Sequence, residues 1–311
     1  VFISRFLASS SDIIAIKTGL GRSFIGIVML ATATSLPELG TGISSILVAG
    51  QPDLAAGDAF GSNIFNLLII AIIDLFWRNR PILTDTGKTP VMIGILGIVV
   101  ITTAVMAILI HTQTKWWSNW SVSPMSFTLV LIFLAGMYMI YRHGINSTET
   151  QMDTTVKYQK NSLTRALLTY SISAFVIVGS SVILANTGDK LTKTMEWEAS
   201  FVGTQFLALS TSLPELATSY AAIRLGAPEL AISNVLGSNL FNTGLILFLD
   251  DLAYTNAPLW IGISNIHSLT AITAILMTLI VIVGLIKRPR ARPHRFFTYE
   301  ALALIALYVT T

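Results

Sequence analysis

The sequence contains no cysteine and little charge. None of its 311 residues is Cys and only 11% are Asp, Glu, Lys or Arg, whereas 53% are hydrophobic and the mean hydropathy is +0.71. The missing thiols exclude disulfides, thiolate metal sites and cysteine nucleophiles. The scarcity of charge excludes a soluble globule of this size, because too few ionic side chains are available to coat its surface. The composition therefore places the chain in a lipid bilayer.

The chain also lacks any polar stretch long enough to form a separate soluble domain. Apolar runs near the roughly 20 residues that a spanning helix needs recur along its whole length. The first residue is Val and the opening run is short for a span, so the first helix looks truncated. We predict an all-α membrane protein with ten transmembrane helices, at residues 1–17, 23–48, 54–76, 90–110, 122–141, 164–187, 199–223, 229–249, 258–286 and 297–311.

Two copies of one acidic motif stand out in this apolar background. Residues 34–39 and 211–216 both read Thr-Ser-Leu-Pro-Glu-Leu, an offset of 177, and a Gly-Ser-Asn element follows each copy at 61–66 and 237–242, an offset of 176. Such self-similarity indicates an internal duplication. The sequence thus predicts a first five-helix repeat at 1–142 with its motif region at 31–66, a linker at 143–162, and a second repeat at 163–311 with its motif region at 208–242.

The number of spans per repeat predicts how the copies are oriented. Five is odd, so the second copy enters the membrane from the opposite side, as in inverted-repeat transporters. Fifteen of the 19 Lys and Arg lie in alternate loops, and only Lys115, Lys190 and Lys193 lie in the loops on the other side. By the positive-inside rule, we expect a plasma-membrane protein with a cytoplasmic linker and both termini outside.

The duplicated motif places one carboxylate in each repeat. A charged side chain near the bilayer centre costs about 2.5 to 3.5 kcal/mol, so Glu38 and Glu215 need cations, protons or basic partners. Arg5 is the nearest basic residue inside a predicted span, and one arginine cannot serve two sites symmetrically. Pro37 and Pro214 break their helices and free the carbonyls four residues earlier, because proline has no amide hydrogen. The motif therefore predicts a buried cation or proton site.

The second element adds neutral oxygen ligands. Ser62 and Asn66 are four residues apart and share a helix face, as do Ser238 and Asn242. One turn earlier, the same face carries Asp58. Carboxylate, hydroxyl, amide and carbonyl oxygens are the ligands that hard cations such as calcium, magnesium, manganese and sodium prefer.

Other acidic residues are also matched between the repeats. We interpret Asp74 and Asp250, which fall near span ends, as interfacial anchors. The matched pairs are Asp12 with Asp189, Asp53 with Glu229, and Asp74 with Asp250.

At these residues the chain resembles the calcium/cation antiporter superfamily, most closely its sodium/calcium exchanger branch. The family's two inverted alpha-repeats carry motifs of the form G-T-S-x-P-E and G-S-x-x-x-N/D, which match residues 34–38 with 62–66 and residues 211–215 with 238–242. The ten-span plan lets the resemblance cover essentially the whole chain.

The resemblance implies a role for each matched residue. Calcium would bind the carboxylates of Glu38 and Glu215 and the carbonyls of Thr34 and Thr211. Sodium would use the same glutamates with Ser35, Ser62, Ser212, Ser238 and the carbonyls of Ala31 and Ala208. Asn66 and Asn242 would occupy the central position.

The sequence departs from the family pattern in three ways. Ala33 and Ser210 replace the glycine before Thr-Ser, which would stiffen the helix break. Asn242 is neutral where some members have Asp, which argues against potassium dependence or proton coupling through that position. Asp58 stands where Asn is common, and it either adds a third carboxylate to the site or faces a polar crevice.

The resemblance implies an antiporter that exchanges sodium for calcium by alternating access. Spans 2, 3, 7 and 8 would hold the ions while spans 1 and 6 slide across them. Its partners would be the bilayer and inorganic cations, with no cofactor and no nucleic acid. A proton/divalent-cation antiporter on the same fold is the alternative. A channel ranks lower, and an intramembrane hydrolase lower still, because no His-Glu-x-x-His motif is present and the four His lie away from the duplicated centre.

Overall fold

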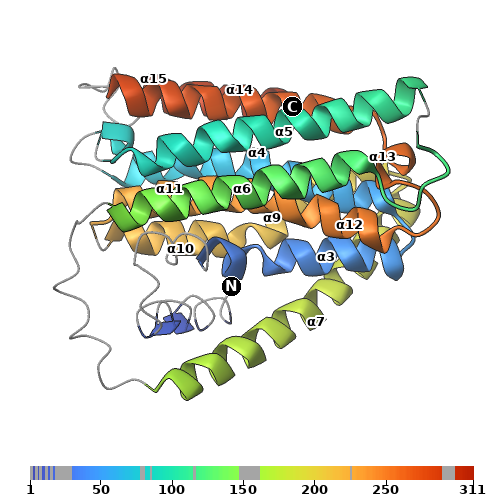
Figure 1. Cartoon of the computed structure of the whole chain (residues 1–311), viewed down its shortest axis with the longest axis horizontal. Helices are drawn as coiled ribbons and strands as arrows, with labels where there is room; N and C mark the ends of the chain where they lie inside the picture. Colours follow the sequence, from blue (N-terminus) through green and yellow to red (C-terminus); the bar gives the residue numbers. More distant parts are fainter. Residues whose placement is uncertain are drawn as a thin grey trace.

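The computed structural model describes residues 3, 6, 9, 10, 13, 14, 17, 30–77, 81–84, 86–114, 117–146, 162–224, 226–288 and 298–311. Over these residues every regular element is a helix, as the composition predicts, and most helices run side by side along one direction (Figure 1). Their bounds are α3 Leu36–Leu47, α4 Pro52–Phe76, η1 Ile82–Thr84, α5 Thr89–Thr114, α6 Pro124–Asn146, α7 Leu163–Met195, α8 Ala199–Val202, η2 Gly203–Leu207, α9 Ala208–Thr211, α10 Leu213–Arg224, α11 Pro228–Phe241, η3 Asn242–Ile246, α12 Leu247–Ala253, α13 Leu259–Gly262, α14 Ile266–Lys287 and α15 Tyr299–Thr310.

Six helices of the described chain are long and apolar enough to cross a membrane. They are Pro52–Phe76, Thr89–Thr114, Pro124–Arg142, Leu163–Met195, Pro228–Ala253 and Ile266–Lys287. Three other predicted spans are helical but shorter or interrupted: the helix through 30–47 turns at Ser35, the helix through 199–224 turns at Ser212, and α15 has 12 residues. Of the predicted span at 1–17, the structure describes residues 3, 6, 9, 10, 13, 14 and 17, all of them helical, and Asp12 lies outside the described residues, so the count of ten stays a prediction.

Two span boundaries differ from the sequence prediction. The run 258–286 is not one helix, because α13 ends at Gly262 and α14 begins at Ile266. The amide of Ser264, between them, donates instead to the carboxylate of Asp53 at 2.6 Å. The helix predicted at 164–187 continues through Gly188 to Met195, since no proline interrupts it before the left-handed Glu196 (φ 57°).

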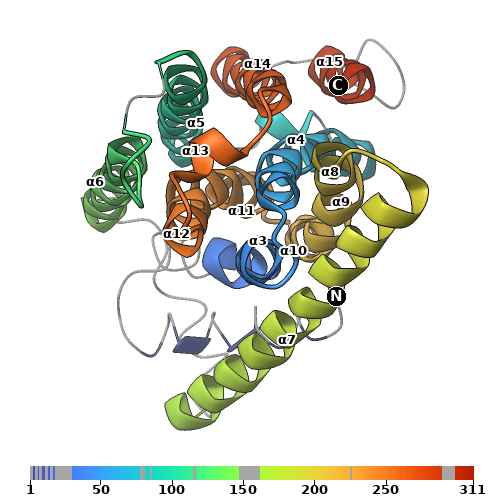
Figure 2. The same ribbon diagram turned by 90° about the vertical axis from the view of Figure 1, so that its right-hand side faces the viewer.

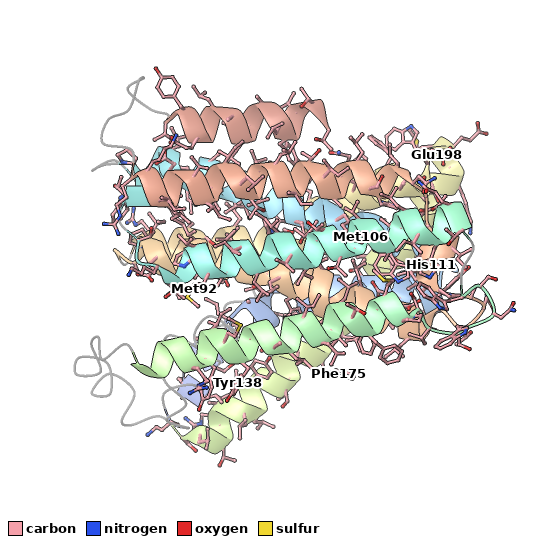
Figure 3. All side chains as sticks on the ribbon, turned by 45° about the horizontal axis from the view of Figure 1, so that its top comes forward. Met92, Met106, His111, Tyr138, Phe175 and Glu198 are labelled. Atoms are coloured by element: carbon pink, nitrogen blue, oxygen red, sulfur yellow. The ribbon has the colours of Figure 1, made fainter. Side chains whose placement is uncertain are left out.

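Burial separates a central group of helices from a surrounding one. In the most apolar stretch, 78% of the residues of α4 and 83% of those of the α11–α12 helix are buried, against 28% for α6 and 17% for α7. Viewed along the helices, α3, α4 and α11 lie inside a ring that includes α5, α6, α14 and α7 (Figure 2). Phe175 on α7 is 81% exposed and, with Tyr138 on α6, points away from the bundle (Figure 3). Large apolar side chains facing outward are those expected of a lipid-facing surface.

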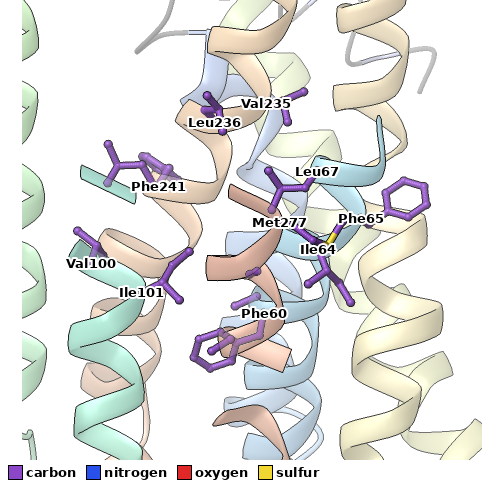
Figure 4. Close-up of a cluster of buried hydrophobic side chains, with 14 of the residues drawn as sticks. Phe60, Ile64, Phe65, Leu67, Val100, Ile101, Val235, Leu236, Phe241 and Met277 are labelled. Atoms are coloured by element: carbon purple, nitrogen blue, oxygen red, sulfur yellow. The ribbon is translucent and has the colours of Figure 1, made fainter. Parts of the chain in front are cut away.

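The apolar core packs around the middle of α4. Phe60, Ile64 and Leu67 are fully buried and belong to one apolar cluster with side chains of α5, α11 and α14, including Ile101 and Met277 (Figure 4). This arrangement fixes the depth and rotation of α4, the helix that carries the second element of the first motif.

Glycines let α4 approach the η2–α9 segment at backbone distance. A Cβ atom added at Gly61 would lie 2.6 Å from the carbonyl oxygen of Thr204, and one at Gly57 would lie 2.9 Å from the Cα of Gly203. Any larger residue at either position would push the two helices apart, because the obstructing atoms belong to the backbone. The absence of side chains at Gly57 and Gly61 therefore allows α4 and the η2–α9 segment to pack backbone against backbone.

Contacts between the two halves are reciprocal. Asp53 at the start of α4 accepts a hydrogen bond from the amide of Ser264 at 2.6 Å, and Glu229 at the start of α11 accepts one from the amide of Gly87 at 3.1 Å. Asp53 and Glu229 are 176 residues apart, and Gly87 and Ser264 are 177 apart. Each half therefore caps the other in the same way.

The structure corrects the matching of Asp74 with Asp250. Asp74 accepts a hydrogen bond from the amide of Ile82 at 2.9 Å, and Asp251 accepts the equivalent bond from the amide of Leu259 at 2.6 Å, eight residues later in both cases. Asp74 and Asp251 are thus the matched loop anchors. Asp250 is buried without a hydrogen-bond partner, so its assignment as an interfacial anchor is wrong.

Candidate ion-binding site

Each duplicated Thr-Ser-Leu-Pro-Glu-Leu motif forms a one-residue turn inside a helix. Ser35 and Ser212 leave the helical conformation, with φ/ψ of −88°/6° and −84°/3°, and the helix resumes at the next residue. Pro37 and Pro214 follow two residues later and supply no amide hydrogen, so the carbonyl four residues before each proline loses its helical donor. The predicted break is present in both repeats, and it is short.

The carbonyls of Ala31 and Ala208, which the sequence implied as sodium ligands, lie one turn before the breaks. They accept the amide hydrogens of Ser35 and Ser212 at 2.9 and 3.0 Å. The hydroxyls of Thr34 and Thr211 donate to the same two oxygens at 3.3 Å, so both lone pairs of each carbonyl are used and a sodium ion there would compete with the threonine hydroxyl.

The two glutamates are buried, and each is held by the opposite repeat. Glu38 is 1% exposed and its Oε1 accepts a hydrogen bond from Ser212 Oγ at 3.2 Å. Glu215 is 0% exposed and its Oε1 accepts from Ser35 Oγ at 3.5 Å and from Ser238 Oγ at 3.3 Å. The exchange of serine donors means that neither carboxylate site is complete within one repeat.

The remaining motif hydroxyls pair across the repeats in the same way. Thr34 Oγ1 lies 3.3 Å from Ser238 Oγ, and Thr211 Oγ1 lies 3.2 Å from Ser62 Oγ. The two pairs are equivalent in the two repeats, because Thr34 matches Thr211 and Ser62 matches Ser238. The structure thus brings all eight of these hydroxyl and carboxylate side chains, four from each copy, into one buried centre, although residues of the two copies are up to about 200 positions apart in sequence.

Asp58 breaks this symmetry. It is 1% exposed, and its Oδ1 accepts a hydrogen bond from Thr211 Oγ1 at 2.9 Å. Its counterpart Asn234 instead donates to Thr218 at 3.1 Å, away from the motif hydroxyls. Of the two roles that the sequence left open for Asp58, this contact favours a third carboxylate beside the site.

Amide side chains of α4 form hydrogen bonds with residues of α11 and η3. Asn66 donates to Asn239 Oδ1 at 3.0 Å, and Asn63 donates to Thr243 Oγ1 at 2.7 Å. Asn242 is fully buried, and neither its oxygen nor its nitrogen has a hydrogen-bond partner. Sequence reasoning singled out Asn66 and Asn242 but passed over Asn63 and Asn239, although their repetition in both Gly-Ser-Asn elements was a usable signal.

A π-helical turn begins at Asn242 and another, η2, ends directly before Ala208. π-helical turns inside α-helices are frequently found at functional sites. No residue pattern in the sequence indicated either turn.

Several buried oxygens of the centre have no partner. Burial of a polar atom without a hydrogen bond is costly, and native proteins retain such atoms mainly where a ligand, ion or water completes them. The atoms concerned are Glu38 Oε2, Glu215 Oε2, Asp58 Oδ2, Asn66 Oδ1 and Asn242 Oδ1. The Asn242 nitrogen is also unpartnered, but the other unpartnered atoms of these side chains are oxygens, which suit a hard cation.

The histidines of the described chain take no part in the centre. His111 Nε2 lies 3.1 Å from Ser123 Oγ at the α5–α6 loop, and His267 Nε2 lies 2.9 Å from Asp53 Oδ1 at the start of α4. The side chains of His143 and His294 are outside the described residues. Within the described residues, no three His, Asp or Glu side chains gather as a metal cluster, so the centre combines few carboxylates with many neutral oxygens.

Comparison with protein families gives a match that covers most of the chain. A family model described as "Sodium/calcium exchanger protein" matches residues 1–142 and 165–311. The chain is also similar to the Inner membrane protein YrbG of Escherichia coli strain K12, with 26% identity over 262 residues, or 79% of this chain and 74% of YrbG.

Two solved structures share the fold. The sodium-calcium exchanger NCX_Mj superimposes with a TM-score of 0.62 and 20% identity, covering 99% of this chain and 92% of that one. The H+/Ca2+ exchanger CAX gives a TM-score of 0.70 and 12% identity, covering 99% and 77%. At these identities the likeness concerns the fold alone.

Proposed function

Since this chain belongs to the sodium/calcium exchanger protein family, we propose that it exchanges sodium for calcium across a membrane as a secondary active transporter. The observation that carries this proposal is the reciprocal hold on two buried carboxylates, Ser212 on Glu38 and Ser35 on Glu215, with the second oxygen of each carboxylate free. Two carboxylates neutralise one divalent cation. Members of the family are transporters and not enzymes, which removes the hydrolase alternative.

The proposed ion ligands are oxygen atoms of this centre. Calcium binds between Glu38 and Glu215 with the carbonyls of Thr34 and Thr211. Sodium ions use the same carboxylates with the neighbouring hydroxyls and carbonyls, and Asn66 and Asn242 line the middle. The sodium ligands besides the glutamates are Ser35, Ser62, Ser212, Ser238, Ala31 and Ala208.

We assign the chain ten transmembrane helices in two inverted five-helix repeats, 1–142 and 163–311. The reciprocal caps of Asp53 and Glu229 and the matched anchors Asp74 and Asp251 support this assignment, because equivalent positions of the two halves make equivalent contacts. The positive-inside rule then puts the linker at 143–162 in the cytoplasm and both termini outside.

Alternating access requires one group of helices to move across another. The helix α7 is the peripheral candidate, since only 17% of its apolar stretch is buried. It contacts the broken helix through a small-residue contact, with Ser181 Oγ donating to the carbonyl of Pro37 at 3.1 Å and Gly40 facing the Ser181 side chain. Movement of α7 would therefore act directly on the break next to Glu38.

A larger residue at Gly40 is expected to impede this movement. A Cβ atom there would lie 2.7 Å from Ser181 Cβ, so Gly40→Val should slow calcium uptake at least about tenfold and lower stability by about 1 to 3 kcal/mol through overpacking. Gly179→Val on α7 is the matched control, because no atom lies within 4 Å of its added Cβ. Equal uptake rates of the two variants would contradict a moving contact at Gly40.

Proton coupling is the second candidate, and Asp58 favours it. This third carboxylate contacts Thr211 inside the centre at 2.9 Å and keeps its Oδ2 free. Three acidic groups can exchange one divalent cation for protons as well as for sodium. The neutral Asn242 weighs against proton coupling at that position.

Calcium-45 uptake into proteoliposomes tests the proposed function. Vesicles carrying the full chain are loaded with sodium and diluted into sodium-free buffer, and a second set carries a proton gradient at equal sodium. Uptake driven by the sodium gradient supports sodium/calcium exchange. Uptake driven by protons alone replaces it with the proton-coupled antiporter, and no uptake under either gradient contradicts calcium as the substrate.

A further inference from the structure

Asp250 is a buried carboxylate that the proposed exchange site does not use. It lies in α12, is 0% exposed, and neither of its oxygens has a hydrogen-bond partner. The groups whose charges act on it, Asp251 and Asp58, are themselves acidic. An ionised carboxylate that is buried with acidic neighbours and no donor is unfavourable, so Asp250 needs either a proton or an accompanying cation.

Asp250 has no counterpart in the first repeat. The residue 177 positions earlier is Ile73, because Asp251 and not Asp250 matches Asp74. Asp251 has a structural role: its carboxylate accepts hydrogen bonds from the amides of Ser123 and Leu259 at 2.8 and 2.6 Å. The carboxylate of Asp251 thus accepts several hydrogen bonds, whereas that of the adjacent Asp250 accepts none. Anchoring of a loop therefore does not explain why Asp250 is buried.

The Asp250 carboxylate lies against the broken helix. A Cβ atom added to Gly42 of α3 would lie 2.7 and 2.8 Å from its two oxygens. On an α-helix, Glu38 one turn before and Ser45 one turn after share the face of Gly42. Both are buried and carry an unpartnered oxygen, Glu38 Oε2 and Ser45 Oγ.

The Asp250 carboxylate, at the level of Gly42, lies between the ion-binding centre and the C-terminal end of α3. Gly42 is four residues beyond Glu38, about 6 Å along the helix axis. The helix ends at Leu47, which is 64% exposed. An ion at Asp250 would therefore be displaced from the two glutamates toward the membrane face at which α3 ends.

We propose that Asp250, with Ser45 and the α3 surface at Gly42, forms a second cation site that binds a monovalent ion. One carboxylate balances one positive charge, and carboxylate and hydroxyl oxygens suit a hard ion such as sodium. The site is asymmetric because only the second repeat supplies its carboxylate. The site lies on the part of the ion pathway between the two glutamates and the membrane face at which α3 ends. Within the described residues, the part of the pathway toward the opposite face has no equivalent carboxylate site.

Sodium binding to the purified full-length chain tests the site without requiring transport. The background is the variant Glu38→Gln/Glu215→Gln, which removes both carboxylates of the central site. We expect this variant to retain binding of sodium-22 and a sodium-dependent rise in melting temperature, measured against choline chloride at equal ionic strength. Adding Asp250→Asn should reduce sodium-22 binding at least tenfold and remove the sodium-dependent rise.

Two further variants keep the test decisive. Asp251→Asn should lower the melting temperature by weakening the loop anchors while sodium binding persists. Gly42→Ala favours the helix but places a methyl group against the Asp250 oxygens, so it should weaken sodium binding even if Asp250→Asn does not fold. Retained binding after Asp250→Asn or Gly42→Ala, or no sodium binding in the glutamate double variant, would overturn the proposal. Failure of calcium uptake by the unmodified chain would contradict the exchange function and leave this result unaffected.

Discussion

Replacing Glu38 or Glu215 with Gln is expected to lower calcium uptake in proteoliposomes by about two to three orders of magnitude. Each substitution keeps the side-chain volume and removes one of the two charges that balance a divalent ion. Two unit charges 4 Å apart interact by about 4 kcal/mol at an effective dielectric constant of 20, which corresponds to roughly a thousandfold change in binding. Both variants should be affected alike, since each carboxylate is held by the opposite repeat.

The control for this experiment is Glu198→Gln. Glu198 precedes α8, is exposed, and lies at the surface of the bundle (Figure 3). Its uptake should equal that of the unmodified chain. A variant of Glu38 or Glu215 that transports calcium at the control rate would show that the reciprocal carboxylates do not bind the ion. Thermal unfolding of each purified variant separates loss of transport from loss of the fold.

Gly61→Val is expected to destabilise the protein by about 3 kcal/mol or more, the upper range of overpacking effects. The added side chain would meet the backbone of Thr204 at 2.6 and 2.7 Å and the side chain of Ala208 at 2.8 Å. Backbone atoms cannot rotate away, so α4 and the η2–α9 segment must separate. Because Ser62 and Thr211 lie on these two segments, the 3.2 Å contact between them should also be lost.

The matched substitution is Gly97→Val in α5, where no atom lies within 4 Å of the added Cβ. Melting temperatures of the two purified variants in the same detergent provide the measurement. We expect Gly97→Val to stay within about 1 kcal/mol of the unmodified chain, as substitutions away from tight contacts do. Similar melting temperatures for both variants would mean that the close approach at Gly61 does not hold the central helices together.

The acidic residues show where sequence matching stops. Asp250 and Asp251 are adjacent, and either offset of the repeat, 176 or 177, fits one of them. Only the hydrogen bonds of Ile82 to Asp74 and Leu259 to Asp251 identify the true pair. A one-residue change in register places a helical side chain about 100° around the axis, so the choice decides between a loop anchor and a buried carboxylate.

The sequence by itself determined the membrane class, the duplication and the candidate residues of the centre. These follow from local facts: the cost of charge in hydrocarbon fixes the apolar runs, and proline interrupts a helix wherever it lies. Glu38, Glu215 and the adjacent serines were therefore identifiable as a polar centre before any coordinates. The resemblance to antiporters then rested on the spacing of the same residues.

Tertiary structure alone decided which partner each residue has. That Ser35 donates to Glu215, that Thr211 bonds Asp58, and that Asp250 lies against Gly42 are contacts between segments more than 100 residues apart. The π-helical turns at Gly203–Leu207 and Asn242–Ile246 likewise have no local signature, because they depend on how neighbouring helices fit. Long-range contacts reflect the relative depth and rotation of whole helices, and a one-dimensional pattern does not contain either quantity.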